Sequence, residues 1–148
     1  LLWRIGLAGG NAGARWSELA DAWSRHIDDA FCTFSDVHAM LAFVGANDRE
    51  RARTLEAKLL QRQRLRTRYG RTTRQLGLSA CRALMAFGRG DDADAIRLLA
   101  RLPPIAHRLG GSHAQRDVLH LTLQHAVQRA RRPTRRLRPL LAAFAVPA

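Results

Sequence analysis

The stretch RALMAFGRGDDADAIRLL, residues 82–99, decides the fold that we expect for this chain. Leu84 belongs to an apolar helical stripe, and Gly88 and Gly90 then supply a backbone that tolerates positive φ. Asp91 follows with a side-chain oxygen that can cap the next helix. The stretch therefore predicts the end of one helix, a tight turn and the start of a second helix, which together make a helical hairpin.

The same pattern occurs 44 residues earlier, in HAMLAFVGANDRERARTL, residues 38–55. In this alignment Ala42 matches Ala86, and Asp48 matches Asp92. A hairpin unit that recurs along a chain is typical of helical repeats, because one hairpin cannot bury its apolar faces without neighbours. We therefore expect an all-α fold made of stacked helical hairpins.

Local signals predict where several of these helices begin. Ser35 or Asp36 can cap the helix that contains AMLAFVG, and the tetrad 47–50 (Asn, Asp, Arg, Glu) fits a capping box. Ser112 with Gln115 makes another capping box. These signals predict helix starts near residues 35, 47 and 112.

Glycine and proline predict where other helices stop. Gly70 is expected to interrupt a helix, and Pro103 with Pro104 is expected to kink or restart the second helix of the 82–99 hairpin before IAHRLGG. The segment TRRLRPLLAAFAVPA, residues 134–148, is expected to pair with the helix over 112–130 as a third hairpin.

The length of 148 residues suits one domain with its own core, and we expect a single helical-repeat domain over residues 1–148. The apolar start LLWRIGL looks like the middle of a helix, so we expect the C-terminal portion of a longer solenoid. No apolar run is long enough to span a bilayer, and neither end resembles a signal peptide. These features predict a cytoplasmic protein with no membrane contact.

The net charge of +13 is unevenly distributed. Residues 1–50 carry four arginines against seven acids, whereas residues 51–148 carry twenty-one bases against five acids. A basic surface favours an acidic partner. Because Lys58 is the only lysine, part of this basicity can instead reflect a GC-rich genome.

Arginine-rich faces raise the alternative of nucleic-acid binding. The run RQRLRTRYGRTTR, residues 62–74, and the cluster over 131–138 would both attract phosphate. Tyr69 is the only aromatic residue in the first run, however, and no known nucleic-acid motif is present. We therefore favour solvated basic faces and rank nucleic-acid binding last among the functions considered.

No arrangement of residues predicts catalysis or a cofactor. The serines lie in no GxSxG turn, and the glycine pairs lack the lysine and hydroxyl of a phosphate loop. Cys32 and Cys81 form no CxxC pair and are flanked by apolar residues, which predicts reduced, buried thiols. His113, Asp117 and His120 share one helix face, but a metal would take every ligand from that single helix, so we expect no metal.

Six polar residues are the candidates for partner binding. Arg116 can alternatively lock adjacent hairpins together through a buried ion pair with Asp36. His38 and His125 each precede an alanine in an apolar helix, which is typical of core or groove histidines. The candidate residues are Asp36, His38, Arg82, Arg116, Asp117 and His125.

Several segments of the chain resemble sequences of known helical-repeat proteins. AFGRGDDADAIRLL, residues 86–99, resembles the hairpin junction of a tetratricopeptide repeat. Three segments, in the order FSDVHAMLAFVGA (34–46), ALMAFGRGD (83–91) and HRLGGSHAQRDVL (107–119), resemble the C-terminal part of the tetratricopeptide repeat protein 38 family. LLWRIGLAG and ARWSELADAW extend this likeness over nearly the whole chain. The resemblance implies a right-handed α-α superhelix of helical hairpins, and it implies no established activity.

The favoured function is a helical-repeat protein-interaction module. A concave groove lined by the helices over 34–46, 75–88 and 112–130 would bind a protein or peptide partner, which the basic composition predicts to be acidic. The alternative is an enzyme of unknown reaction whose pocket an absent N-terminal part would complete.

Overall fold

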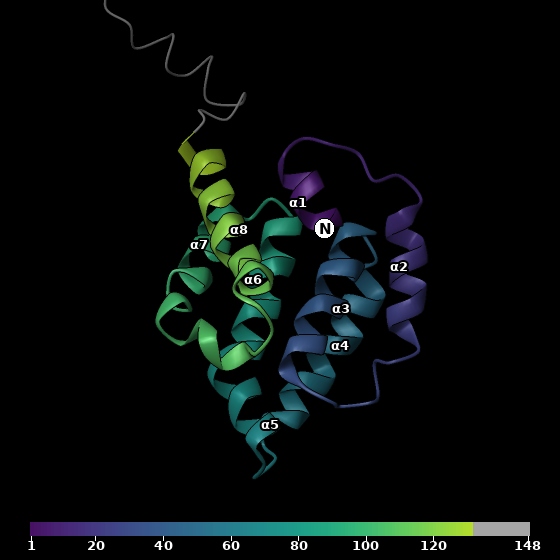
Figure 1. The fold of residues 1–148 in the computed structure, drawn as a ribbon, viewed down its shortest axis with the longest axis vertical. Coiled ribbons are helices and arrows are strands. Elements are labelled where there is room, and N and C mark those ends of the chain that lie inside the picture. Colours follow the sequence, from purple (N-terminus) through teal and green to yellow (C-terminus); the bar gives the residue numbers. More distant parts are fainter. Residues whose placement is uncertain (132–148) are drawn as a thin grey trace, which may run out of the picture.

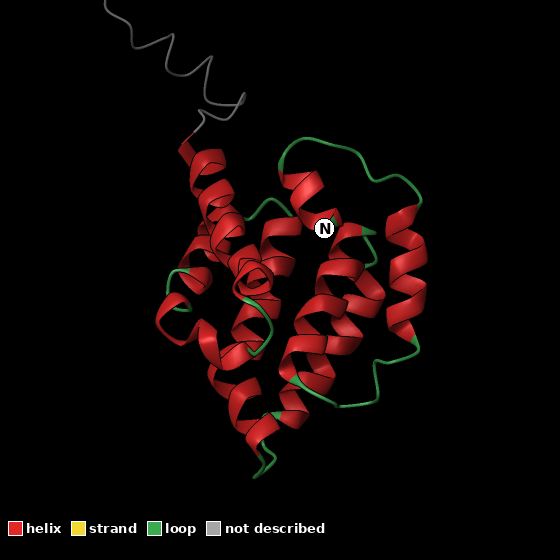
Figure 2. Cartoon of the chain, in the orientation of Figure 1, coloured by secondary structure: helices red, strands yellow, loops and turns green. Residues whose placement is uncertain are grey.

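The computed structural model describes residues 1–131, which form helices and short connections (Figures 1 and 2). No β-strand occurs among these residues, so the predicted all-α fold class is confirmed. The helix that we predicted over 134–148 lies outside the described residues. In chain order the elements are α1 (Leu2–Leu7), α2 (Arg15–Ser24), α3 (Thr33–Gly45), α4 (Arg49–Arg62), α5 (Arg68–Thr72), the π-helical segment η1 (Thr73–Gly77), α6 (Leu78–Gly88), α7 (Asp92–Leu99), the 3-10 segment η2 (Pro103–Leu109) and α8 (His113–Arg131).

Two helical hairpins, α3 with α4 and α6 with α7, form the frame of the fold (Figure 1). Each turn contains one residue with positive φ, which is Asn47 (55°) in the first and Gly90 (78°) in the second. The next residue caps the following helix in both cases, and the caps are Asp48 and Asp91. Asp92, which we had matched to Asp48, lies instead in the first turn of α7.

The two turns repeat at a spacing of 43 residues, not the 44 that we predicted. The capping residues Asp48 and Asp91 are 43 apart, and so are the carbonyls of Phe43 and Ala86, to which their amides donate (2.8 and 2.9 Å). Ala86 therefore corresponds to Phe43, and the predicted match between Ala42 and Ala86 is wrong. The two Ala-Phe pairs align at 44 because the second turn has one residue fewer between the phenylalanine and the cap.

Two predicted helix starts also differ from the structure. α3 begins after Cys32 without a side-chain cap, so neither Ser35 nor Asp36 caps it. Asp36 lies instead in the first turn of α3 and is buried. The cap of α4 is the residue after Asn47, because Asn47 itself takes the positive-φ position of the turn.

Gly70 does not interrupt a helix. It lies inside α5, which continues through η1 into α6 without a break. Thr67 caps this helix by accepting a hydrogen bond from the amide of Gly70 (3.1 Å). A Cβ on Gly70 would lie 2.3 Å from the carbonyl oxygen of Leu65, so glycine permits a close approach of the preceding loop.

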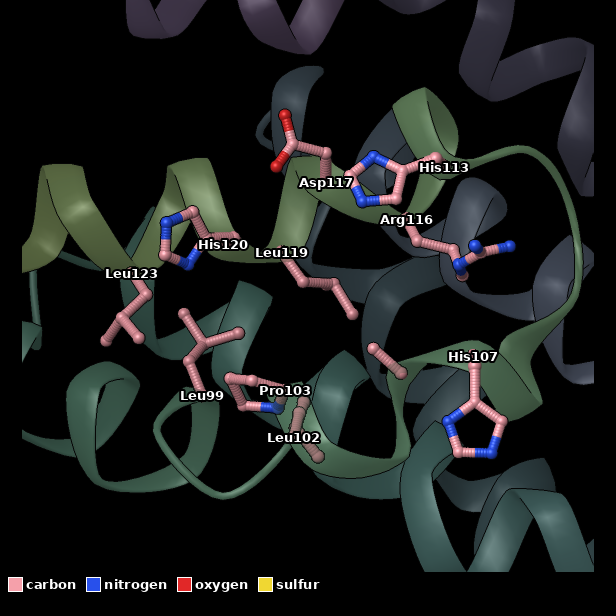
Figure 3. A pocket seen from close by; sticks show the side chains of 11 residues that line it. Leu99, Leu102, Pro103, His107, His113, Arg116, Asp117, Leu119, His120 and Leu123 are labelled. Carbon is pink, nitrogen blue, oxygen red and sulfur yellow. The ribbon is translucent and has the colours of Figure 1, made fainter.

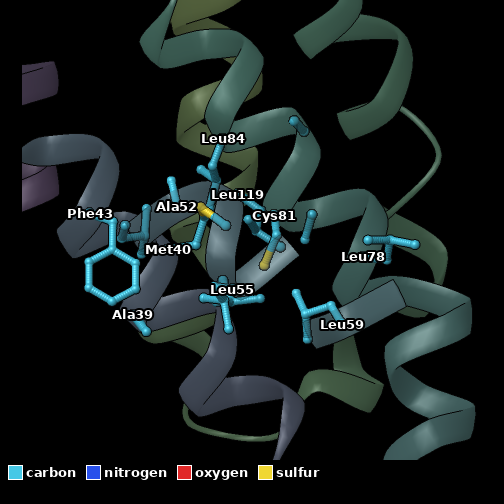
Figure 4. Packing of buried hydrophobic residues seen from close by; sticks show 14 of the residues in the cluster. Ala39, Met40, Phe43, Ala52, Leu55, Leu59, Leu78, Cys81, Leu84 and Leu119 are labelled. Atoms are coloured by element: carbon cyan, nitrogen blue, oxygen red, sulfur yellow. The ribbon is translucent and has the colours of Figure 1, made fainter. Parts of the chain in front are cut away.

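The core lies where α3 and α4 meet α6 (Figure 4). Met40, Phe43 and Leu84 are fully buried in it, and burial of each such side chain contributes about 1.5–3 kcal/mol. Small residues let the helices approach closely, because a Cβ on Gly77 would lie 2.4 Å from the Cγ2 atom of buried Thr33. Further small buried residues of α3 and α6 are Ala39, Ala42, Ala80, Ala83 and Ala86.

The other helices cover this frame. α2 packs on α3 and buries Ala20, whereas α8 packs on α7 and α6. The indole nitrogen of Trp3 donates a hydrogen bond to the hydroxyl of Thr122 (2.9 Å), which joins α1 to α8. Within residues 1–131, no helix combines the length and the apolar composition that crossing a bilayer requires.

Candidate functional site

A cleft with a volume of about 390 Å³ lies between the end of α7, η2 and the first half of α8 (Figure 3). We call it the α8 cleft. The side chain of Leu119 points from α8 toward Leu99 and Leu102, and with Leu123 these residues form an apolar floor. The polar residues of the cleft are His107, His113, Arg116, Asp117 and His120.

Prolines and glycines in the sequence build this cleft. Pro103 and Pro104 occupy the first positions of η2, as their fixed φ favours, so the helix restarts here after α7, as we predicted. Gly110 and Gly111 both have positive φ and lead into α8. A Cβ on Gly111 would lie 2.3 Å from the ring of Phe34, so this turn packs directly on α3.

The predicted capping box at the start of α8 is confirmed. The amide of Ser112 donates to the side-chain oxygen of Gln115 (2.8 Å), and the amide of Gln115 donates to the hydroxyl of Ser112 (3.3 Å). This exchange fixes the first turn of α8, on which His113, Arg116 and Asp117 are placed. His113, Arg116 and Asp117 are therefore held on a defined helix end.

The polar rim of the α8 cleft carries one arginine, one carboxylate and three histidines. Asp117 is half-buried and forms an ion pair with Arg4 of α1 (3.3 Å), so a neighbouring base balances its charge. Its carboxylate points away from Leu99 and Leu102 (Figure 3). Arg116 donates to the carbonyl of Gly111 (2.5 Å) while it lines the cleft. The rim therefore presents one arginine and three imidazoles around an apolar floor.

This arrangement suits recognition of an anion attached to an apolar group. Arginine and histidine donate hydrogen bonds to carboxylates, and the leucine floor favours an aliphatic or aromatic side chain. Within residues 1–131 no set of three or more histidine, cysteine, aspartate or glutamate residues is placed to hold a metal ion. The face shared by His113, Asp117 and His120 thus does not form such a cluster in the described structure.

Asp36 pairs with Arg62 and Tyr69, and the predicted pair with Arg116 is wrong. The Tyr69 hydroxyl donates to one carboxylate oxygen of Asp36 (2.8 Å), and Arg62 lies 3.4 Å from the other. Arg62 also donates to the carbonyl of Ile27 (2.6 Å). The reason is geometric: Asp36 lies in the first turn of α3 and faces the end of α4, whereas Arg116 faces the α8 cleft.

Burial controls the protonation of this network. Burial raises the pKa of Asp36, against the opposing effects of the Tyr69 hydroxyl and the Arg62 charge. Burial and the adjacent carboxylate of Asp36 also raise the pKa of Tyr69, which therefore stays protonated and donates. The network thus joins α3, α4 and α5 in the folded chain.

Both cysteines are free thiols, as predicted, but only one is fully buried. Cys81 lies in the core with its sulfur 3.9 Å from the carbonyl oxygen of Asp36, and burial raises its pKa well above the ordinary value. Cys32 is partly buried at the start of α3. The high pKa of the Cys81 thiol makes it a poor nucleophile.

His38 and Arg82 make local contacts outside the α8 cleft. The Nδ1 atom of half-buried His38 lies 2.9 Å from the carbonyl oxygen of Phe34, and the two rings stack with centroids 4.0 Å apart. Burial lowers the pKa of His38. Arg82 is exposed on α6 and forms an ion pair with Glu56 of α4 (2.6 Å).

His125 borders a second cavity, of about 340 Å³, between α1 and the second half of α8. Its walls are aromatic: Trp3 lies edge-on to Trp16 at 6.2 Å and 5.8 Å from Phe87. Arg129 lies over the ring of Phe87 at 4.0 Å and is held by Asp92. Of the six candidate residues, only Arg116 and Asp117 thus border the same cavity.

Sequence reasoning missed His107 and the leucines of the cleft floor. His107 follows the two prolines by a few residues, and the HRLGG turn returns it toward α8. The HRLGG turn is the sequence feature that could have indicated that His107 lies near α8. Leu99, Leu102 and Leu123 carried no signal for binding, because an apolar residue at helical spacing indicates core packing.

The likeness to the tetratricopeptide repeat protein 38 family rests on the quoted segments and stays a prediction. No protein-family model matches the chain, and no solved structure matches it.

Proposed function

We propose that this chain is a helical-repeat interaction module, similar in architecture to a tetratricopeptide-repeat solenoid, and that its α8 cleft binds an acidic, amphipathic peptide segment of a partner protein. The observation that carries the proposal is the combination of a leucine floor with a rim of hydrogen-bond donors, Arg116 and three histidines, in one open cleft. A peptide that places an apolar side chain among acidic ones would complement both parts.

The repeated turn supports the helical-repeat architecture. Asp48 and Asp91 cap equivalent helices at a spacing of 43 residues, and α3 packs directly on α6 of the next hairpin. Stacked hairpins commonly present binding surfaces along their length. The right-handed superhelix and the family resemblance remain part of this proposal.

The distribution of polar groups favours binding over catalysis. The candidate residues Asp36, His38, Arg82 and His125 lie apart from the cleft, and each has its own local surroundings. Groups that act together on a substrate must converge within hydrogen-bond reach. A peptide-binding surface needs only complementary charge and an apolar anchor point, which the cleft supplies.

Titration with a synthetic peptide tests the proposal. The probe is a short helical peptide with leucines on one face and glutamates on the other, and the control probe carries lysines in place of the glutamates. Amide chemical-shift changes in the full chain report where each peptide binds. We expect the glutamate peptide to perturb η2 and the first turns of α8, and the lysine peptide to leave them unchanged.

Two matched variants test whether peptide binding depends on the α8 cleft or on the positive net charge of the whole chain. Arg116→Glu reverses a rim charge and should weaken binding of the glutamate peptide at least tenfold, whereas Arg15→Glu makes the same change on exposed α2 and should alter it less than twofold. Equal effects of the two substitutions, or perturbations outside the cleft, would contradict the proposal.

A further inference from the structure

Exposed large hydrophobic side chains gather at one end of the molecule. The described residues contain four of them, and three lie near that end: Phe31 (82% exposed), Leu65 (46%) and Leu60 (36%). Phe31 belongs to the α2–α3 connection, Leu60 to the last turn of α4, and Leu65 to the α4–α5 connection. Both connections lie toward the lower end of the molecule in Figure 1. We call this end, formed by residues 25–32 and 60–71, the basal face.

Exposed arginines lie in the same chain segments as Leu60 and Leu65. Arg64, Arg66, Arg68 and Arg71 are all exposed on the basal face. No acidic residue occurs between Glu56 and Asp91 in the sequence. The nearest acids, Asp28 and Asp29, are paired with Lys58 and His26. The basal face therefore combines exposed apolar side chains with exposed arginines.

The buried network holds both connections of the basal face in place. Arg62, at the end of α4, donates to the carbonyl of Ile27 in the first connection, while Tyr69, after the second, donates to Asp36. Gly70 lets the second connection pack against α5, since a side chain there would meet Leu65. These hydrogen bonds connect the basal face to Asp36 in the first turn of α3.

Backbone strain accompanies the exposure of Phe31. The preceding residue, Ala30, has a φ of 50°, a left-handed conformation that residues with a Cβ rarely adopt. A conformation of this kind is kept only where the surrounding structure imposes it, and it is frequent at functional positions. Here it accompanies the most exposed aromatic side chain of the described chain.

We propose that the basal face binds the surface of an anionic lipid bilayer, with Phe31 and Leu65 entering the interface and the arginines facing lipid phosphates. Peripheral proteins combine exposed aromatic and aliphatic side chains with basic ones for this purpose. No membrane contact was expected from the sequence, which lacks a spanning segment. A peripheral contact needs no such segment, and the exposure of Phe31 is apparent only in the fold.

A bilayer fits this face better than nucleic acid does. The α4–α5 connection lies at the lower end of the molecule, where it can meet a flat surface (Figure 1). Leu60 and Leu65 gain free energy only where water is removed from them, and lipid provides such an environment. Arg62, which we had counted among the phosphate-binding arginines, is buried and paired with Asp36.

Vesicle flotation with the full chain tests the inference. The chain is mixed with phosphatidylcholine vesicles that contain or lack phosphatidylserine, at about 0.1 M salt. We expect binding to the phosphatidylserine vesicles and little to the neutral ones. Arg64→Gln with Arg66→Gln should weaken binding about 25-fold, because each arginine contributes roughly fivefold. Arg15→Gln with Arg89→Gln, two exposed arginines elsewhere, should weaken it less than threefold.

A second variant isolates the apolar contribution. Phe31→Ser with Leu65→Ser leaves the charge unchanged and should weaken vesicle binding at least tenfold, while circular dichroism shows an unchanged fold. Absence of vesicle binding would overturn the inference. So would equal losses in the basal and control arginine variants, or an apolar variant that binds vesicles normally while the chain binds an RNA oligonucleotide at the same salt. The acidic-peptide titration is unaffected by any of these outcomes, because it concerns the α8 cleft.

Discussion

The α3–α6 contact and the α8 cleft differ in how tightly their side chains meet. At the α3–α6 contact, Gly77 and Gly88 leave no room for even a methyl group beside Thr33 and Val44. In the α8 cleft, four leucines border about 390 Å³ of open space. Both regions are built from helices of one chain, but α3 and α6 bury more apolar side chains than α7 and α8 do. The difference indicates that the first region provides stability and that the second is available for binding.

The largest expected difference concerns core and cleft side chains. Phe43→Ala removes a fully buried ring from the core where α3 and α4 meet α6 and should lower the free energy of unfolding by about 3–5 kcal/mol. Leu123→Ala removes a partly buried side chain from the cleft floor and should lower it by less than about 1.5 kcal/mol. Urea unfolding of both variants gives the two values. If the two variants lost similar unfolding free energy, the core would not contribute more to stability than the cleft floor, which would contradict the proposed division of roles.

The buried ion pair should matter more than an exposed one. Arg62→Met leaves Asp36 buried without its positive partner and should cost about 3 kcal/mol. Arg82→Met breaks the more exposed pair with Glu56 and should cost less than about 1 kcal/mol. Chemical unfolding gives the free energy of unfolding of both variants. Adding Asp36→Leu to Arg62→Met should recover part of the lost unfolding free energy, because no unpaired carboxylate then stays buried. A double variant that is less stable than Arg62→Met alone would contradict loss of the ion pair as the cause.

Glycine substitutions sharpen the contrast in packing. Gly77→Ala places a methyl group 2.4 Å from the side chain of buried Thr33 and should destabilise the fold by about 1–3 kcal/mol. Gly6→Ala in α1 meets nothing within 4 Å and should stabilise it by up to about 1 kcal/mol, as alanine does in helices. Thermal unfolding should show a lower melting temperature for Gly77→Ala and a higher one for Gly6→Ala. A neutral Gly77→Ala would show that α3 and α6 can separate at little cost.

The smallest expected effect is a pH dependence from His38. Burial lowers the pKa of His38 in the folded chain, so the unfolded chain binds its proton first as the pH falls below the ordinary value of 6.5. The stability due to neutral His38 is complete above 6.5 and is lost as the pH falls through the lower folded value. Asp36, whose pKa is raised, acts in the opposite direction, and its effect is the same in a His38 variant.

Melting temperatures measure this effect. Between about pH 7.5 and about pH 5, the wild type should lose more thermal stability than His38→Phe does. The difference between the two proteins isolates the histidine from the carboxylates. An identical pH dependence would show that His38 takes no part in acid destabilisation.

Local sequence signals predicted the fold in part. The hairpin at 82–99, the capping box of Ser112 and Gln115, and the restart of the chain at Pro103 and Pro104 are confirmed. The caps at Ser35 or Asp36 and the interruption at Gly70 are wrong, so local signals alone do not determine every helix boundary. The 44-residue register was wrong because residue identity aligns the Ala-Phe pairs, whereas backbone hydrogen bonds align the capping aspartates. Matching the two Ala-Phe pairs does not show that the two turns differ in length by one residue.

The candidate site was predicted only in part. Arg116 and Asp117 do border the cleft, since a polar string at a helix start indicates an accessible surface. The partners of Asp36 could not be predicted, because Arg62 and Tyr69 reach it only after α4 and α5 fold back against α3. Contacts of that kind depend on the packing of distant elements and leave no local pattern in the sequence.

Hydrogen–deuterium exchange of the full chain, with and without the glutamate peptide, tests the division of roles most directly. The slowest amides should lie in α3 and α6, and the peptide should slow exchange in η2 and the first turns of α8 only. If the slowest amides lie in α8, or if the peptide protects α3 and α6 instead of the cleft, the division of stability and binding between the two regions is contradicted.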